Sequence, residues 1–262
     1  MDLGIRGKVA LVAASSKGLG RAVAEELAAE GAHLVMCARG KEALDKTAES
    51  IRQTTGVKVV AVAADVSNPA DAARVVKAAF DELGKVDILV TNSGGPPSGT
   101  FENLTAEMWD AATSLLLKSA VELTRAVLPG MKERRWGRIL NVTSIAAKQP
   151  IEGLMLSNSL RAAVIGFART LATEVAPFNV TVNNLLPGYT RTDRVQELAR
   201  ATGGKGGSST DIVSRWEKEI PMGRLCEPRE FAALAAFLAS ERASYITGSS
   251  IAVDGGWIRS LL

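Results

Sequence analysis

The stretch that decides the fold is KVALVAASSKGLGRAVA, from Lys8 to Ala24. It opens with an apolar run, Val9–Ala14, of the kind that buried parallel strands have. A loop of small residues follows and contains Gly18 and Gly20. From Arg21 to Ala29 the apolar residues return at helical spacing. A strand, a glycine loop and a helix in this order predict the beginning of a βαβ unit.

The start of that helix predicts a binding site for a phosphate group. Unpaired backbone N–H groups at a helix N-terminus, together with the helix dipole, favour an anion. The two glycines would let the backbone approach the pyrophosphate of a dinucleotide closely. A short glycine motif also occurs in ordinary turns, so the loop alone leaves both alternatives open.

The composition fits one large α/β domain that spans residues 1–262. The formal net charge of +3 is too balanced to indicate a nucleic-acid-binding surface. Cys37 and Cys226 are far apart without a CxxC pair, so we expect neither a metal site nor a disulfide. The sequence begins MDLGIRGK and shows neither an apolar signal region nor an apolar run of membrane-spanning length. We expect a soluble cytoplasmic protein with no membrane or nucleic-acid partner.

Strand-like and helix-like segments alternate along the chain. The expected strands are Val9–Ala14, His33–Ala38, Val57–Ala63, Val86–Thr91, Gly137–Thr143, Val180–Leu186 and Ser249–Val253. The expected helices are Arg21–Ala29, Lys41–Gln53, Pro69–Leu83, Ala106–Arg134, Leu160–Ala176, Asp211–Glu219 and Pro228–Leu238. This alternation predicts an α/β fold of Rossmann type, a doubly wound parallel sheet of about seven strands with helices on both faces. Ala201–Thr210, rich in Gly and Ser, is expected to be a mobile loop or lid.

Several short motifs in a fixed order reveal a resemblance that covers essentially the whole chain. After the glycine loop come Asp65-Val66, Thr91-Asn92-Ser93-Gly94, Asn141-Val142-Thr143-Ser144, Pro187-Gly188 and Val253-Asp254-Gly255-Gly256. The chain resembles the short-chain dehydrogenase/reductase family, and within it the 3-oxoacyl-(acyl-carrier-protein) reductase group. The resemblance implies an oxidoreductase that binds a nicotinamide cofactor. The cofactor contacts we expect are Ala14, Ser16, Lys17, Gly18, Leu19, Gly20, Arg39, Asp65, Val66, Asn92, Ser93, Gly94, Arg161, Pro187, Gly188 and Thr190.

The chain departs from the family pattern at the positions that carry catalysis. The family has a Tyr thirteen residues after its active Ser and a Lys four residues further. Counting from Ser144 gives Ser157 and Arg161 instead. The family's asparagine on the long helix is replaced by Leu116, and its TGxxxGxG loop begins here with Ala13-Ala14. An alanine in the first glycine position requires a negative φ to avoid strain, so we expect a reshaped turn.

Carbonyl reduction needs a hydride donor, a polarised carbonyl and a proton source. Ser157 is shorter and less acidic than a tyrosine, and Arg161 can bind ribose hydroxyls but stays protonated. Loss of a general acid lowers the rate roughly 10²–10⁴-fold. Tyr189 and Lys148 are candidate substitutes, each with the alternative of a pocket wall or a solvated side chain. The catalytic candidates are Ser144, Lys148, Ser157, Arg161 and Tyr189.

The residues after the second expected strand bear on the choice of cofactor. Enzymes that use NAD place an acidic residue there, which binds the ribose 2′-hydroxyl. This chain has Ala38 followed by Arg39, and Lys17 precedes the loop glycine. Two cations without an acid predict NADP(H). The alternative is that both cations are simply solvated.

Three functional hypotheses follow. The first is an NADP(H)-dependent reductase of a ketone or 3-oxoacyl thioester with atypical proton delivery. The second is a catalytically impaired nucleotide-binding protein with a regulatory or structural role. The third is a different reaction on the same cofactor scaffold.

Two further features concern partners. The basic run Lys132, Arg134, Arg135 and Arg138 could dock an acidic acyl carrier protein, or could simply complement a helix dipole. The helices expected at Ala106–Arg134 and Leu160–Ala176 carry apolar residues on more than one face. Such surfaces, and the family resemblance, predict a homotetramer.

Overall fold

A single parallel sheet forms the centre of the molecule in the computed structural model, which describes residues 2–203 and 208–260. Its seven strands within the described chain follow the order β3-β2-β1-β4-β5-β6-β7. They are β1 (Val9–Ala13), β2 (His33–Ala38), β3 (Val59–Ala63), β4 (Ile88–Thr91), β5 (Gly137–Val142), β6 (Val180–Pro187) and β7 (Ser250–Val253). Every pair of neighbouring strands is parallel. The predicted doubly wound sheet is therefore confirmed.

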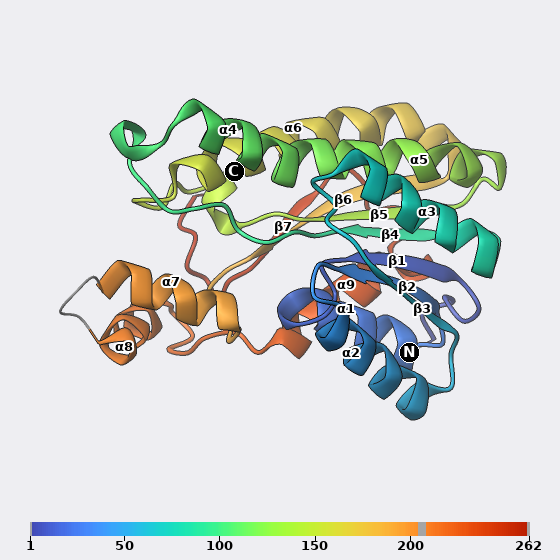
Figure 1. The fold of residues 1–262 in the computed structure, drawn as a ribbon, viewed down its shortest axis with the longest axis horizontal. Helices are drawn as coiled ribbons and strands as arrows, with labels where there is room; N and C mark the ends of the chain where they lie inside the picture. The colour runs from blue at the N-terminus through green and yellow to red at the C-terminus, as the bar shows by residue number, and fades with distance from the viewer. Residues whose placement is uncertain (1, 204–207, 261–262) are drawn as a thin grey trace.

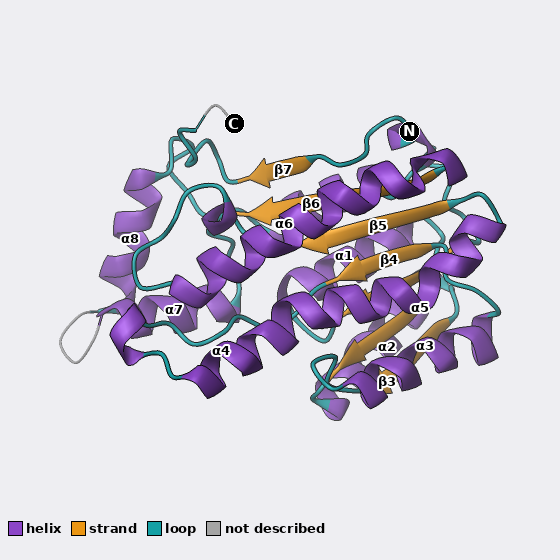
Figure 2. Cartoon of the chain, turned by 90° about the horizontal axis from the view of Figure 1, so that it is seen from above, coloured by secondary structure: helices purple, strands orange, loops and turns teal. Residues whose placement is uncertain are grey.

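Helices cover both faces of the sheet (Figure 1). The α-helices are α1 (Gly18–Ala29), α2 (Lys41–Thr55), α3 (Pro69–Leu83), α4 (Ala106–Thr113), α5 (Ser119–Glu133), α6 (Met155–Val175), α7 (Asp193–Gly203), α8 (Ser209–Glu219) and α9 (Pro228–Leu238). α1, α2 and α9 pack on one face, and α3, α5 and α6 pack on the other. α7 and α8 lie beyond the ends to which the strand arrows point (Figure 2). No helix in the described part of the chain is long and apolar enough to cross a membrane.

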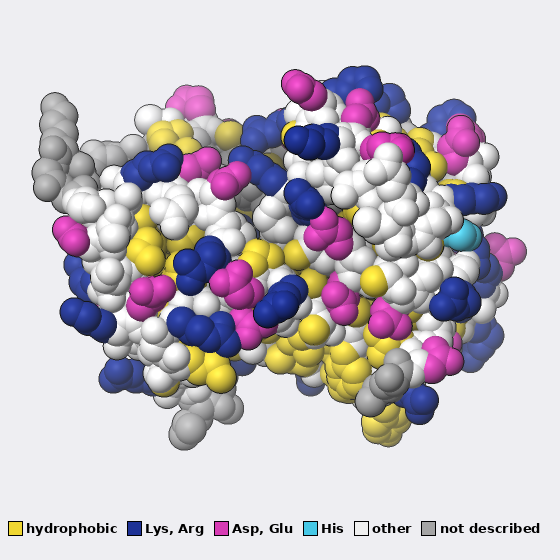
Figure 3. Space-filling model, turned by 90° about the horizontal axis from the view of Figure 1, so that it is seen from below, with side chains coloured by type: hydrophobic (Ala, Val, Ile, Leu, Met, Phe, Trp, Pro, Cys, Tyr) yellow, Lys and Arg dark blue, Asp and Glu magenta, His cyan; other side chains and the backbone are white. Residues whose placement is uncertain are grey.

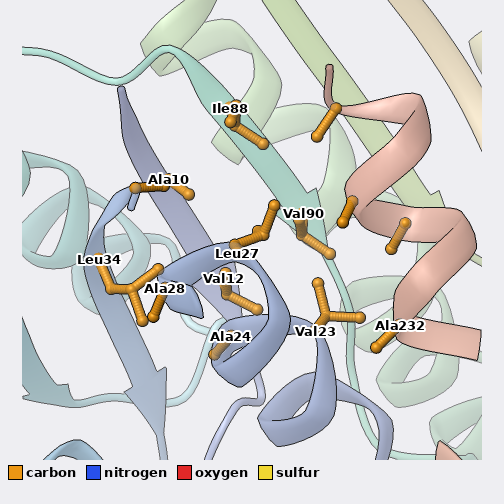
Figure 4. Close-up of a cluster of buried hydrophobic side chains, with 14 of the residues drawn as sticks. Ala10, Val12, Val23, Ala24, Leu27, Ala28, Leu34, Ile88, Val90 and Ala232 are labelled. Carbon is orange, nitrogen blue, oxygen red and sulfur yellow. The ribbon is translucent and has the colours of Figure 1, made fainter. Parts of the chain in front are cut away.

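The glycine-loop helix α1 is held against the sheet by a close-packed cluster (Figure 4). Val23 and Leu27 of α1 are fully buried and belong to one cluster with Val12 of β1 and Val90 of β4. Small residues on α1, such as Ala24, let the helix approach both the sheet and α9. Burial of each Val or Leu side chain contributes about 1.5–3 kcal/mol, so the helix N-terminus has a fixed position at the sheet edge.

The order of the strands places a crevice at the carboxyl end of β1. β1 pairs with β2 on one side and with β4 on the other, so the chain winds in opposite directions from this point. Ligands of open parallel sheets bind at such a switch point, outside the carboxyl ends of the strands. The segments after β1 and β4 carry the glycine loop and the motif with Asn92.

A row of hydrogen-bonded polar side chains joins the four neighbouring strands β4, β5, β6 and β7. Thr91 Oγ1 donates to Asn141 Oδ1 at 2.7 Å, and Asn141 Nδ2 donates to Asn184 Oδ1 at 3.1 Å. Asn184 Nδ2 then donates to Ser250 Oγ at 3.0 Å. Each such bond contributes about 1 kcal/mol, and leaving one partner unpaired would be more unfavourable than that. The row fixes the register of β4 to β7 where the site is built.

The helices differ from expectation in several places: α7 was not expected, and α1 begins at Gly18, three residues before the expected start. The helix expected at Ala106–Arg134 contains a π-helical turn, Ser114–Lys118, between α4 and α5. α6 begins at Met155, five residues earlier than expected. Of the expected loop Ala201–Thr210, residues 201–203 end α7, residues 209–210 begin α8, and 204–207 lie outside the described residues.

The four cations of the basic run all make contacts within their own chain. Arg138 is fully buried, and its guanidinium lies 4.4 Å from the centroid of the Trp136 ring and 3.5 Å from Glu241. Arg134 Nη2 donates to the Val86 carbonyl at 2.8 Å. Lys132 lies over the Phe178 ring, and Arg135 donates to the Pro177 carbonyl. These contacts favour the structural interpretation of the run over docking of an acyl carrier protein. Elsewhere on the surface, cations and acids are interspersed on the face shown in Figure 3, in line with the small net charge.

Candidate active site

The glycine loop keeps a left-handed first residue although that residue is alanine. Ala14 has φ of +49°, and Gly18 has φ of +59°. The expectation of a negative φ at Ala14 and a reshaped turn is therefore wrong. The conformation is supported from outside the loop, because Asn92 Nδ2 donates to the Ala14 carbonyl at 3.4 Å. An L-residue in this region is strained by about 1–2 kcal/mol.

That strain gives a prediction about stability. We expect Ala14→Gly to raise the free energy of unfolding by about 0.5–1 kcal/mol, because glycine removes the strain but has a more flexible unfolded state. The matched control is Ala13→Gly, one residue earlier in β1, which should lower stability. Urea denaturation monitored by circular dichroism measures both variants. An Ala14→Gly protein that is less stable than the native chain would contradict this account of the loop.

Gly20, the second glycine of the loop, leaves room for a closely packed backbone. A Cβ at Gly20 would overlap the Ala14 carbonyl oxygen and lie 2.8 Å from Asn92 Nδ2. The N-cap residue of α1 is Lys17, and its side chain does not cap the helix. The first backbone N–H groups of α1 are thus left to an external acceptor, and a phosphate is the acceptor that helix N-termini favour. The loop therefore fits the pyrophosphate of a dinucleotide.

Cations stand on both sides of this loop. Arg39 follows β2 and is exposed, as a residue that meets a 2′-phosphate at the protein surface should be. Lys17 is also exposed, and its Nζ lies 3.4 Å from Asp193 Oδ2 at the start of α7. Such an exposed ion pair contributes at most about 1 kcal/mol, so a phosphate can readily compete with Asp193.

Most of the other predicted cofactor contacts lie at the same edge of the sheet. Asp65 follows β3, and its Oδ1 accepts bonds from the backbone N and the Oγ of Ser67. The remaining residues in or just after the carboxyl ends of β1, β3, β4 and β6 are Ser16, Leu19, Val66, Ser93, Gly94, Pro187 and Gly188.

Thr190, another predicted cofactor contact, is buried within its own turn. Its side chain is buried, and its hydroxyl donates to the Gly188 carbonyl at 3.3 Å. Two residues later, Thr192 Cγ2 lies 3.6 Å from the position of a Cβ on Gly18. The structure thus places Thr192, rather than the predicted Thr190, against the glycine loop. The sequence holds a Thr at both positions, and only the turn after β6 distinguishes them.

Ser157 and Arg161, which the resemblance aligns with the family's Tyr and Lys, contact each other. Arg161 Nε donates to Ser157 Oγ at 3.1 Å, across one turn of α6. Arg161 Nη1 donates to the carbonyls of Val142 at 3.1 Å and Thr143 at 2.7 Å, at the end of β5. Burial, and to a lesser extent the charge of Arg194, lowers the pKa of Arg161 to about 10. The guanidinium is still charged at neutral pH, and it is fixed at the sheet edge.

A small cavity lies beside this pair. Its volume is about 10 Å³, which is close to the room that one water molecule needs. It is lined by Thr91, Asn92, Ser93, Leu116, Ser119, Ala120, Val142, Thr143, Arg161 and Val164. Leu116 reaches it from the π-helical turn and is otherwise packed in an apolar cluster with Leu156 and Leu160.

Tyr189 and Lys148, the two candidate proton donors from the sequence, lie in different surroundings. Tyr189 is stacked on Trp216, with ring centroids 4.4 Å apart, and its edge faces Trp257 at 5.9 Å. Burial raises the pKa of Tyr189 to about 12, so it is a weaker acid than a free tyrosine. Lys148 is exposed at the end of a short turn after β5, which Ser144 caps by accepting from the Ala146 backbone N at 3.1 Å. The packing of Tyr189 favours the pocket-wall interpretation.

Comparison with known proteins agrees with this geometry. The family model described as enoyl-(acyl carrier protein) reductase matches residues 13–258. The chain is 37% identical to the 3-oxoacyl-(acyl-carrier-protein) reductase FabG of Vibrio cholerae over 254 residues, covering 97% of this chain and 98% of that protein. The chain belongs to the short-chain dehydrogenase/reductase family.

Solved structures of relatives superpose over nearly the full length. The L-sorbose reductase of Gluconobacter frateurii, in complex with NADPH and L-sorbose, has a TM-score of 0.95 and 39% identity, with 100% of both chains covered. A variant of actinorhodin polyketide ketoreductase with NADPH has a TM-score of 0.92 and 30% identity, and covers 97% of this chain and 98% of its own.

Proposed function

We propose that this protein is an NADP(H)-dependent oxidoreductase that reduces a ketone or a 3-oxoacyl thioester, with Ser157 and Arg161 in place of the usual proton-donating pair. The observation that carries the proposal is the Arg161 guanidinium, held between the end of β5 and Ser157 beside the cavity. A cation stays at the position from which the family binds the nicotinamide ribose. A cation that binds the ribose orients the nicotinamide for hydride transfer. Correct orientation of the cofactor contributes more to hydride transfer than the identity of the proton donor does.

The cofactor is NADP(H), in agreement with the sequence-based prediction, since both solved relatives described above are NADPH complexes. When bound, it supplies the hydride. We assign the pyrophosphate to the backbone N–H groups of the loop around Gly18 and Gly20, and the 2′-phosphate to Arg39 and Lys17. Asp65 after β3 and Asn92 after β4 flank these two positions at the carboxyl edge of the sheet.

In this proposal the Ser157 hydroxyl and water molecules deliver the proton to the substrate. Ser157 Oγ accepts from Arg161, which leaves its own proton free to be donated. The neighbouring positive charge stabilises the alkoxide that forms when the proton is given to the developing alkoxide of the substrate. A water molecule then returns a proton to Ser157. Because a serine is shorter than a tyrosine, a second water can stand between Ser157 and the substrate oxygen, while Ser144 donates to the carbonyl.

A catalytically impaired nucleotide-binding protein remains the second candidate. The observation in its favour is Leu116, whose apolar side chain occupies the position of the family's asparagine on the wall of the cavity. Under this alternative the glycine loop and its cations bind NADPH and no reduction follows.

A titration with NADPH and NADH, followed by a turnover assay with a 3-oxoacyl thioester in the same cell, tests both candidates. We expect tighter binding of NADPH and slow but measurable oxidation of NADPH. Binding without turnover of thioesters or simple ketones would support the second candidate. The homotetramer remains part of this proposal.

The cofactor preference should be reversible. We expect Arg39→Asp to weaken NADPH binding roughly 10–100-fold, since a charge-assisted hydrogen bond to the 2′-phosphate is lost, and to make NADH the preferred cofactor. Arg125→Asp on α5 introduces the same charge change away from the site and should leave the preference unchanged. Fluorescence titration with both cofactors measures the ratio. An unchanged ratio in Arg39→Asp would show that Arg39 does not meet the 2′-phosphate.

A further inference from the structure

Two adjacent side chains in the first turn of α7, Asp193 and Arg194, contact different segments at the carboxyl edge of the sheet. Asp193 faces the glycine loop through Lys17. Arg194 reaches the segment after β4, where its Nη2 donates to the Pro96 carbonyl at 3.0 Å. A helix on the far side of the site is thereby attached to both loops that border the cofactor crevice.

A glycine makes room for the Arg194 guanidinium. A Cβ on Gly95 would lie 2.5 Å from Arg194 Nη2 and 2.6 Å from its Nε, closer than any side chain allows. Gly95 does not have a positive φ, so its backbone conformation does not require glycine. The absence of a side chain at Gly95 thus leaves room for the Arg194 guanidinium, which lies against the segment after β4.

Arg161 of α6 lines the small cavity together with Asn92 and Ser93, which begin the segment that Arg194 contacts at Gly95 and Pro96. Its Nε and Nη1 are used by Ser157 Oγ and by the two carbonyls at the end of β5. Its Nη2 donates to no partner among residues 2–203 and 208–260. The positive charge of Arg194 contributes to the lowered pKa of Arg161, in agreement with the contacts of both arginines along the segment after β4.

The nearest acid does little to offset the charge of Arg194. Glu197 Oε2 lies 3.9 Å from Arg194 Nη1, between two exposed side chains one turn apart on α7. By contrast Arg191, three residues before Arg194, has Glu227 at 2.8 Å and Glu217 at 3.9 Å. A pair of like charges at a site mouth is relieved by an anion bound between them.

We propose that the substrate carries an oxyanion, a carboxylate or a phosphate, which Arg194 and the free Nη2 of Arg161 bind while the carbonyl lies at Ser144 and Ser157. This inference rests on the proposed function and adds the class of substrate to it. Arg194 is the specificity-determining residue, because it touches the anionic group and not the reacting carbonyl. Arginine suits this task because its planar donors match two oxygens of one carboxylate.

A matched pair of substrates tests the inference. 3-Oxobutanoate and methyl 3-oxobutanoate share the ketone and differ in the charge. We expect the native protein to favour the acid in kcat/KM, and Arg194→Met to lower that preference roughly 10–100-fold, the loss of a charge-assisted bond, mainly through KM. Arg194→Lys should recover part of it. Arg191→Met, the paired neighbour, should leave it unchanged, and all variants should bind NADPH as the native protein does.

A binding measurement separates this inference from the proposed reaction. Calorimetry of 3-oxobutanoate with the protein saturated in NADP⁺ needs no turnover, and Arg194→Met should weaken that binding by the same factor. If neither ketone is reduced but the acid binds through Arg194, the subsite stands and the proposed reaction fails. Equal use of acid and ester by the native protein would overturn the subsite. So would an Arg194→Met protein that loses NADPH affinity as strongly as acid affinity, because the oxyanion would then be the cofactor's pyrophosphate.

Discussion

The variant that combines Leu116→Asn, Ser157→Tyr and Arg161→Lys is expected to reduce a 3-oxoacyl thioester roughly 10²–10⁴-fold faster than the native chain, the range attributable to a positioned general acid. It introduces the three residues that the resemblance implies for these positions: the acid, the cation that lowers the pKa of the acid, and the helix asparagine. These groups act as a unit, so Ser157→Tyr alone should recover only part of the rate.

The structure shows where the substitutions disturb the fold. Arg161 bonds to two carbonyls at the end of β5, and a lysine, with its single charged nitrogen, cannot reproduce the planar arrangement of donors. Leu116→Asn removes an apolar side chain from a buried cluster. The same position lines a cavity with Thr91 and Ser119, whose hydroxyls can form hydrogen bonds with the new amide. We therefore expect a lower Tm with little change in NADPH affinity.

Single-turnover kinetics with saturating NADPH measures the gain, with binding followed separately by fluorescence. A triple variant that folds and binds NADPH but reduces no 3-oxoacyl thioester would show that the pocket is not shaped for that substrate. A native protein that is already fast would show that Ser157 and Arg161 suffice. Tyr189→Phe and Lys148→Met would then identify any other donor.

The sheet could be predicted from the sequence because each strand carries its own signal. The apolar runs of β1, β2 and β4 are bounded by loop residues, and parallel strands joined by helices admit few orders. The sequence does not predict α7, because this helix is largely polar and buries little more than Ala199. The π-helical turn at Ser114–Lys118 has no sequence signal of its own, since its residues also suit an α-helix.

The site was less predictable because it depends on contacts between distant segments. The positive φ of Ala14 is supported by Asn92, a residue on another strand end. The direction of one turn decides that Thr192, and not Thr190, lies against the glycine loop. Arg194 has no motif, and its place against the loop after β4 could be seen only once α7 was located. Local patterns thus identify which loops form a site, and packing decides which side chains face it.

The final prediction concerns the glycine on which the cofactor crevice depends. We expect Gly20→Ala to weaken NADPH binding roughly 100-fold or more, because the new methyl group overlaps the Ala14 carbonyl and displaces both the loop and Asn92.

The overlap is confined to the loop, so the variant should keep its far-ultraviolet circular dichroism and lose about 1–3 kcal/mol of stability. Gly166→Ala in α6 is the matched control, since a Cβ there meets nothing within 4 Å and the residue is helical. It should bind NADPH normally and gain stability, as alanine is the better helix former by about 1 kcal/mol. A folded Gly20→Ala protein that binds NADPH as tightly as the Gly166→Ala control would mean that the pyrophosphate does not lie on this loop.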